Sequence, residues 1–156
     1  MRASYLLDTN VVSELHRAIR GKGDPQVTTW LAHTGLSTCH ISAITLMELE
    51  IGVLRLERRD MAQALLLRTW LETRVLPEFA ERVLPVDAIV AQRCAGLHVP
   101  DPRPERDALI AATALVHSMT VVTRNTADFE PTGVALLNPW QHGTLQEAKA
   151  RYAKHD

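Results

Sequence analysis

Cysteine is scarce in this sequence, and its two cysteines lack the spacing of a metal-ligand or redox motif. Cys39 and Cys94 lie far apart in a chain of 156 residues, and neither belongs to a CxxC pair. This usage predicts free, buried thiols in a reducing compartment and excludes a disulfide-stabilised scaffold. We therefore expect a single domain whose core depends on apolar packing, which a chain of this length can supply.

Long apolar runs are also absent. No segment reaches the roughly 18 consecutive apolar residues of a membrane-spanning helix. Residues 1–4 lead directly into an apolar strand, without the apolar region and small-residue cleavage site of a signal peptide. We expect a cytoplasmic protein with no membrane partner.

A basic excess and abundant aromatic residues are missing too. The chain carries 17 Lys and Arg against 18 Asp and Glu, a formal net charge of -1, and only 4% aromatic residues. This balance argues against a protein that binds nucleic acid through its overall charge. It does not exclude a metal-dependent nucleic-acid enzyme, because bound cations supply positive charge that a residue count omits.

What the sequence does contain is a regular alternation of strand and helix signals. Short apolar runs without period-two alternation are typical of strands that are buried on both faces of a parallel sheet. We predict strands over 5–7, 36–41, 83–86, 120–123 and 134–137. We predict helices from residue 25 onward and over 11–20, 43–55, 61–75, 88–97 and 107–117. The pattern indicates an α/β fold in which helices wrap a central, mostly parallel sheet.

Capping and breaking residues set the expected element ends. Asn10 is predicted to cap the first helix and Ser42 the helix that follows the second strand. Pro77 is expected to end the helix over 61–75, and Pro85 suggests an edge strand or the end of a strand. Three prolines between residues 99 and 106 predict a loop.

Acidic and amide side chains follow the predicted strands. Ligands of open α/β sheets gather at the carboxyl ends of the strands. Asp8 follows the first strand, and Asn125 and Asp128 follow the strand over 120–123. Glu48 and Asp107 belong to helical segments near such ends.

Each acid alone also has an ordinary structural interpretation. Asp107 and Asp8 both fit a helix N-cap, and Glu48 fits the solvated face of its helix. Several carboxylates converging at one sheet edge would instead repel one another unless a positive group lay among them. Mg²⁺ or Mn²⁺ takes oxygen ligands and activates water for attack on a phosphodiester, which makes a metal site the alternative hypothesis.

Other catalytic motifs are absent. The sequence has no GxSxG, GxxxxGK[ST] or GxGxxG motif, and its seven histidines show no HExxH spacing. Asp8-Thr9-Asn10 also differs from the Asp-x-Asp motif of phosphatases with an aspartyl nucleophile, because Asn10 replaces the second acid.

Four sequence blocks are spread over almost the whole chain, at residues 5–14, 42–52, 106–114 and 121–129. Together, and in this order, they resemble the PIN-domain ribonucleases of the VapC type, in particular the FitB-like subgroup. The resemblance implies a single PIN-like domain over residues 1–140. The remaining residues, 141–156, are expected to form a polar and partly helical C-terminal tail.

The resemblance also implies roles for individual residues. An acidic quartet would bind Mg²⁺ or Mn²⁺ and position the attacking water; it comprises Asp8, Glu48, Asp107 and Asp128. Asp8 and Asp107 are the expected direct ligands, Glu48 binds directly or through water and is the candidate general base, and Asp128 closes the site. Thr9 and Asn125 match supporting polar positions, although local turn and cap bonding explains both residues equally well.

The function that the resemblance implies is that of a toxin in a type II toxin–antitoxin system. Such a protein is a metal-dependent endoribonuclease that cleaves RNA until a small antitoxin blocks its site, and it usually forms a homodimer, which assembles further with antitoxin. Two alternatives remain. One is a catalytically silent PIN protein that binds an antitoxin or regulates its operon, and the other is a housekeeping RNA-processing nuclease.

An apolar stripe at helical spacing exceeds what a helix beside a thin sheet usually buries. It comprises Met61, Leu65, Leu66, Trp70 and Leu71. The stripe fits the core, a dimer interface or an antitoxin groove. For the interface we select Met61, Leu65 and Trp70.

Overall fold

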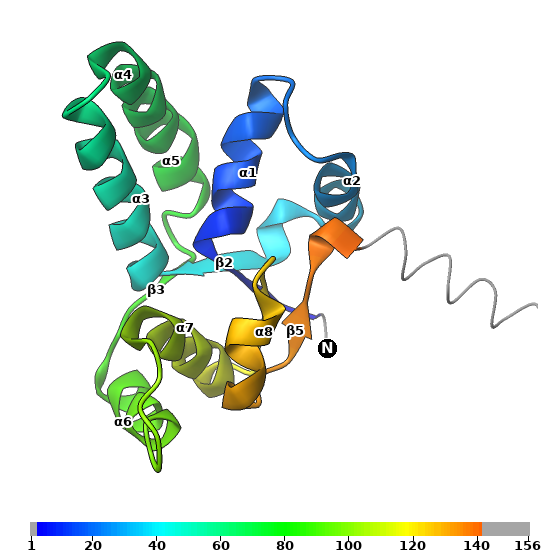
Figure 1. Ribbon diagram of the computed structural model, residues 1–156. Helices are drawn as coiled ribbons and strands as arrows, with labels where there is room; N and C mark the ends of the chain where they lie inside the picture. Colours follow the sequence, from blue (N-terminus) through cyan, green and yellow to red (C-terminus); the bar gives the residue numbers. More distant parts are fainter. Residues whose placement is uncertain (1–2, 142–156) are drawn as a thin grey trace, which may run out of the picture.

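A five-stranded parallel sheet forms the centre of the described part of the chain (Figure 1). The structure is a computed structural model that describes residues 3–141. The strand order is β3-β2-β1-β4-β5. The strands are β1 (Tyr5–Leu7), β2 (Cys39–Ser42), β3 (Val83–Leu84), β4 (Thr120–Val122) and β5 (Leu136–Leu137). The predicted α/β fold with a parallel sheet is confirmed, and β3 lies at an edge as Pro85 suggested.

Helices connect successive strands and cover both faces of the sheet (Figure 1). The α-helices are α1 (Thr9–Ile19), α2 (Pro25–Thr34), α3 (Ala43–Glu57), α4 (Met61–Trp70), α5 (Leu76–Glu78), α6 (Ala88–Leu97), α7 (Glu105–Val116) and α8 (Thr126–Phe129). Short 3-10 turns occur at η1 (Leu36–Thr38), η3 (Glu130–Thr132) and η4 (Pro139–Gln141), and η2 (Leu71–Val75) is a π-helix. None of the described helices is long and apolar enough to cross a membrane.

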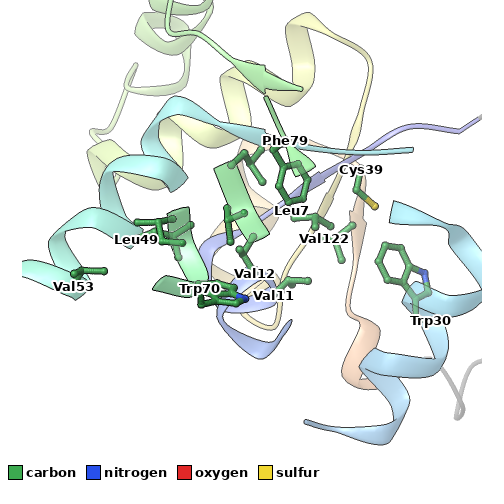
Figure 2. Packing of buried hydrophobic residues seen from close by; sticks show 13 residues of the cluster. Leu7, Val11, Val12, Trp30, Cys39, Leu49, Val53, Trp70, Phe79 and Val122 are labelled. Atoms are coloured by element: carbon green, nitrogen blue, oxygen red, sulfur yellow. The ribbon is translucent and has the colours of Figure 1, made fainter. Parts of the chain in front are cut away.

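Alternate residues of the central strands enter different apolar clusters. Leu7 and Val122 belong to a cluster with α1, α3, α4 and η2, whereas Leu6 and Val121 belong to a cluster with α7 and α8. Figure 2 shows the first cluster, with Trp30 at one end and Val53 at the other. Burial on both faces explains why the strands read as continuous apolar runs. Both cysteines are free and buried, as their spacing predicted.

The first helix begins earlier than expected, and its cap is Asp8 rather than Asn10. Asp8 has extended backbone angles, and its side chain accepts a hydrogen bond from the backbone N–H of Thr9. Thr9 is already the first helical residue. The prediction that Asn10 caps this helix is therefore wrong, and Asp8 occupies both the end of β1 and the helix cap.

Other element boundaries also differ from the prediction, two of them for a clear physical reason. Gly35 adopts a positive φ of 83° after α2, and η1 follows it, so that the second strand begins at Cys39 rather than near residue 36. Pro77 does not end the helix that starts at Met61, since helical structure continues through η2 to Glu78. The backbone N–H of Leu76 donates to the carbonyl of Leu71, five residues earlier, which is the hydrogen bond of a π-helix. This wider register precedes Pro77, which lacks an N–H to continue α-helical bonding.

The apolar stripe divides between core and surface. Trp70 and Leu71 are buried in the first cluster, with exposed fractions of 7% and 0%. Met61, Leu65 and Leu66 are exposed. Trp70 is therefore a core residue, and its selection as an interface residue was wrong. The expected C-terminal tail falls almost entirely on residues 142–156, which lie outside the described residues.

Candidate active site

Asp8 lies at the centre of the candidate site, where β1 ends and α1 begins. Its carboxylate is buried, with only 6% of the residue exposed. One oxygen, Oδ1, accepts the Thr9 N–H at 2.8 Å, and the other, Oδ2, accepts the Thr123 hydroxyl at 2.8 Å. Both bonds leave free lone pairs, because each carboxylate oxygen has about two acceptor positions. The carboxylate is thus held in one orientation and can still bind a cation.

Thr123 is a site residue that the sequence analysis did not select. It is fully buried directly after β4, the strand beside β1. Its hydroxyl donates to Asp8 and accepts hydrogen bonds from the backbone N–H of Asn125 at 3.0 Å and from the side-chain amide of Asn10 at 3.4 Å. Its place at the carboxyl end of a central strand was the available signal. The residue connects the loop after β4 to the start of α1.

Glu48 lies in α3 and reaches the same edge through Thr9. Its Oε1 accepts the Thr9 hydroxyl at 2.8 Å, and its Oε2 lies 3.6 Å from the guanidinium of Arg106. The side chain is 25% exposed and is engaged on both oxygens, so the interpretation of Glu48 as a freely solvated helix residue is wrong. Glu50 has a different partner, Arg68, at 2.7 Å.

Asp107 lies in the first turn of α7 and does not cap that helix. The helix begins at Glu105, the cap position is Pro104, and no side chain caps it by a hydrogen bond. Burial raises the pKa of Asp107 above its ordinary value, and the charges of Asp8, Asp128 and Glu48 raise it further. Because the helix starts two residues earlier, the N-cap interpretation of Asp107 is wrong. Its carboxylate instead interacts electrostatically with the other three acids.

Asp128 and Asn125 contribute from the segment after β4. Asp128 is exposed in the short helix α8, and its charge raises the pKa values of Asp8 and Asp107. Asn125 is the residue before α8, but its side chain does not cap the helix. Its backbone N–H bonds to Thr123, so the structure places Asn125 in the site through its backbone.

The four acids form one electrostatically coupled group. Burial is the largest cause of the raised pKa of Asp8, and the hydrogen bonds from Thr123 and Thr9 oppose it. The charges of Glu48 and Asp128 raise the pKa of Asp8 as well. Mutual repulsion of this kind is relieved by a cation, and the available donors are the carboxylate oxygens that a hard divalent ion prefers.

The donor set fits a sparsely coordinated divalent ion better than a closed metal site. Within residues 3–141, no three histidine, cysteine or acidic side chains are already grouped to hold a metal ion. Mg²⁺ usually binds proteins through one or two carboxylates and keeps waters or substrate phosphates as its other ligands. Asp8 and Asp107, with Glu48 and Asp128 around them, are compatible with that mode of binding.

Comparison with known proteins identifies the family. The PIN domain family model matches residues 5–133, which is most of the chain. The chain belongs to the PIN domain family. This PIN domain is 37% identical over 144 residues to the VapC ribonuclease Y4jK of Sinorhizobium fredii, covering 87% of the chain and 97% of that relative. It is 40% identical over 140 residues to the toxin FitB of Neisseria gonorrhoeae, covering 86% and 97%.

A solved structure supports the same assignment of fold. The PIN domain matches a chain of the FitAcB crystal structure from Neisseria gonorrhoeae with a TM-score of 0.78 and 39% identity, covering 87% of this chain and 98% of that chain. A toxin-antitoxin complex from Klebsiella pneumoniae matches with a TM-score of 0.60 and 25% identity, covering 87% and 98%. The similarity therefore spans almost the full length of these relatives.

Proposed function

We propose that this PIN domain is the toxin of a type II toxin–antitoxin system and acts as a divalent-metal-dependent endoribonuclease. The observation that carries the proposal is the coupled group of four carboxylates at the carboxyl edge of the sheet. Relatives named as a VapC ribonuclease and as a toxin, similar over nearly their whole length, support the same activity.

In the proposed mechanism Asp8 and Asp107 would hold the ion, Glu48 would bind it directly or through water, and Asp128 would close the site. The chemistry that a bound Mg²⁺ or Mn²⁺ would supply is that of a Lewis acid, stabilising negative charge on the scissile phosphate. The Thr123 hydroxyl orients Asp8 through a 2.8 Å hydrogen bond. The Thr9 hydroxyl holds one oxygen of Glu48 through another hydrogen bond of 2.8 Å.

Glu48 is the proposed general base. Its carboxylate accepts a proton from the attacking water as the water oxygen forms a bond to phosphorus and the RNA P–O bond breaks. The leaving oxygen takes up a proton from solvent. Asn125 is assigned a supporting place through its backbone bond to Thr123.

The proposed partners are an RNA substrate, a small antitoxin protein and a second copy of the chain. Exposed apolar side chains on the contacting helices α3 and α4 support the dimer, because a second copy of the chain would remove their apolar surface from water. They are Leu54, Met61, Leu65 and Leu66. Trp70 is excluded from this surface by its burial.

Growth of cells that express the chain without an antitoxin tests the proposed function. We expect induction of the wild type to arrest growth and to fragment RNA, and induction of Asp107→Asn at equal protein level to do neither. Growth arrest that persists in Asp107→Asn would favour a catalytically silent protein. Normal growth with active purified enzyme would favour a housekeeping nuclease.

A further inference from the structure

Arg124 lies one residue beyond the site residue Thr123, at the carboxyl edge of the sheet. It is exposed, and its guanidinium carbon lies 5.2 Å from the ring centroid of Trp140. Trp140 belongs to η4, which follows the edge strand β5. In strand order, this edge therefore carries Glu48 after β2, Asp8 after β1, Arg124 after β4 and Trp140 after β5.

Both members of the Arg124–Trp140 pair are anchored to the fold. The backbone N–H of Arg124 donates to the side chain of Asn10 at 3.3 Å, which connects it to the start of α1. The backbone N–H of Trp140 donates to the Asn138 side chain at 2.9 Å, and its ring packs against the first apolar cluster. The aromatic ring is a fixed support for the guanidinium, so less conformational entropy is lost when Arg124 binds a ligand.

The charge of Arg124 is available to a ligand. Some arginines are held by acids: Arg68 lies 2.7 Å from Glu50 and Arg82 lies 2.8 Å from Glu78. Among the described residues, no ion pair joins Arg124 to an acidic side chain. Contact with a ring face leaves the edge N–H donors of the guanidinium free to bind a phosphate in the bidentate manner.

An acidic active site needs local positive charge to hold a polyanion. The chain has a net charge of -1, so its overall charge does not attract RNA. β4 is adjacent to β1 and β5 is the next strand, which puts the end of β5 about 10 Å from that of β1 at the usual strand spacing. This places the Arg124–Trp140 pair beside the carboxylates, along the same edge.

We propose that Arg124, supported by Trp140, binds a backbone phosphate of the RNA next to the bond that is cleaved. The inference rests on the proposed ribonuclease function and adds a substrate-binding residue to it. Arg124 is not assigned a part in metal binding or proton transfer. Its loss therefore weakens RNA binding rather than the chemical step.

Salt dependence of RNA binding tests the inference. The probe is a fluorescent RNA that the wild-type protein cleaves, and the parent is the full chain with Asp8→Asn, so that the RNA stays intact in Mg²⁺. Arg124→Gln is expected to bind several-fold more weakly. Its slope of log affinity against log salt is expected to be smaller by about 0.7, the value for one phosphate contact on a single strand.

Two further variants make the test specific. Arg124→Lys keeps the charge and is expected to restore the slope, with an affinity between those of Arg124→Gln and the parent. Arg58→Gln removes an exposed arginine at the far end of α3 and is expected to leave affinity and slope unchanged. Thermal melting of each variant checks that its fold is intact.

Failure of the Arg124 inference and failure of the proposed ribonuclease function give different results in this experiment. An unchanged slope in Arg124→Gln, or an equal loss in Arg58→Gln, overturns the local phosphate contact while the nuclease proposal stands. Failure of the parent to bind any RNA, together with absence of cleavage by the wild type, overturns the inference and the proposed function together.

Discussion

The hydroxyl of Thr123 donates a 2.8 Å hydrogen bond to Oδ2 of Asp8 and so joins the ends of two adjacent strands. The two residues are 115 positions apart in the chain. The bond fixes the orientation of a buried carboxylate that we propose as a metal ligand. Partners that orient metal ligands in this way fix the geometry of the ligand and so contribute to metal affinity and activity.

Thr123→Val tests this relationship, because valine keeps the shape and removes the hydroxyl. We expect a loss of metal affinity or cleavage rate of about 10- to 100-fold. Metal binding by calorimetry and cleavage at saturating metal are the measurements. Thr113→Val is the matched control, since Thr113 is also buried but donates to Leu109 within α7. Equal effects in both variants would contradict a specific role for Thr123.

Glu48→Gln tests the proposed general base. Glutamine can still accept the Thr9 hydroxyl, but it cannot take a proton from water. We expect the cleavage rate constant to fall by about 10²- to 10⁴-fold while RNA binding is retained. The control is Glu50→Gln in the same helix, whose partner is Arg68. A rate close to wild type in Glu48→Gln would exclude the residue as the base.

Asp107→Asn tests the electrostatic coupling through stability. The pKa of Asp107 is raised by burial and then by Asp8, Asp128 and Glu48, so the folded chain binds this proton more tightly than the unfolded chain does. Stability of the metal-free wild type therefore falls as pH rises from the ordinary aspartate pKa through the raised value.

Asparagine at position 107 cannot ionise, so Asp107→Asn avoids the stability that the wild type loses when Asp107 gives up its proton. Without metal, the variant is therefore expected to be more stable than the wild type near pH 7. The advantage should disappear as the pH falls below the ordinary aspartate pKa of 3.8, where Asp107 is protonated in both the folded and the unfolded chain, as urea unfolding in EDTA measures. Asp101→Asn makes the same charge change in the exposed segment before α7 and should show no such trend. A constant difference at all pH values would contradict the coupling.

Leu65→Glu tests the proposed dimer surface on α3 and α4. Leu65 is 66% exposed, so the change is expected to alter the unfolding free energy of the monomer by no more than about 0.5 kcal/mol. Sedimentation should show a dimer for the wild type and a monomer for the variant. Trp70→Ala, in the core beside this surface, should instead cost about 3–5 kcal/mol. A wild type that sediments as a monomer would exclude the dimer.

Local signals in the sequence were sufficient to predict most of the fold. Ser42 and Asp87 accept hydrogen bonds at the starts of α3 and α6, since capping depends on residues within one helical turn. The start of α1 was misplaced because Asp8 and Asn10 are both good caps, and residue preference does not choose between them; in the folded chain Asp8 accepts the Thr9 N–H. The helical structure continues past Pro77 because π-helical hydrogen bonding precedes the proline, and residue preferences do not reveal that bonding.

The candidate site shows the same division between local and non-local information. Asp8 and Glu48 could be selected from their places after strands, because strand ends in a parallel sheet share one edge. Thr123 also follows a strand, but its role, like that of Arg124, depends on a contact that only the folded chain makes: Thr123 bonds to Asp8, and Arg124 lies against Trp140. The division of the apolar stripe into the buried Trp70 and the exposed Leu65 likewise follows from packing against the sheet.

Cleavage of a mixed pool of structured RNA by purified wild type and Asp8→Asn is the most direct test of the central claim. Each protein, shown to be folded and free of antitoxin, is incubated with Mg²⁺, Mn²⁺ or EDTA, and the cut ends are sequenced. We expect cuts by the wild type with either metal, none in EDTA and none by Asp8→Asn. Metal-dependent cleavage retained by Asp8→Asn, or cleavage by the wild type in EDTA, would contradict it.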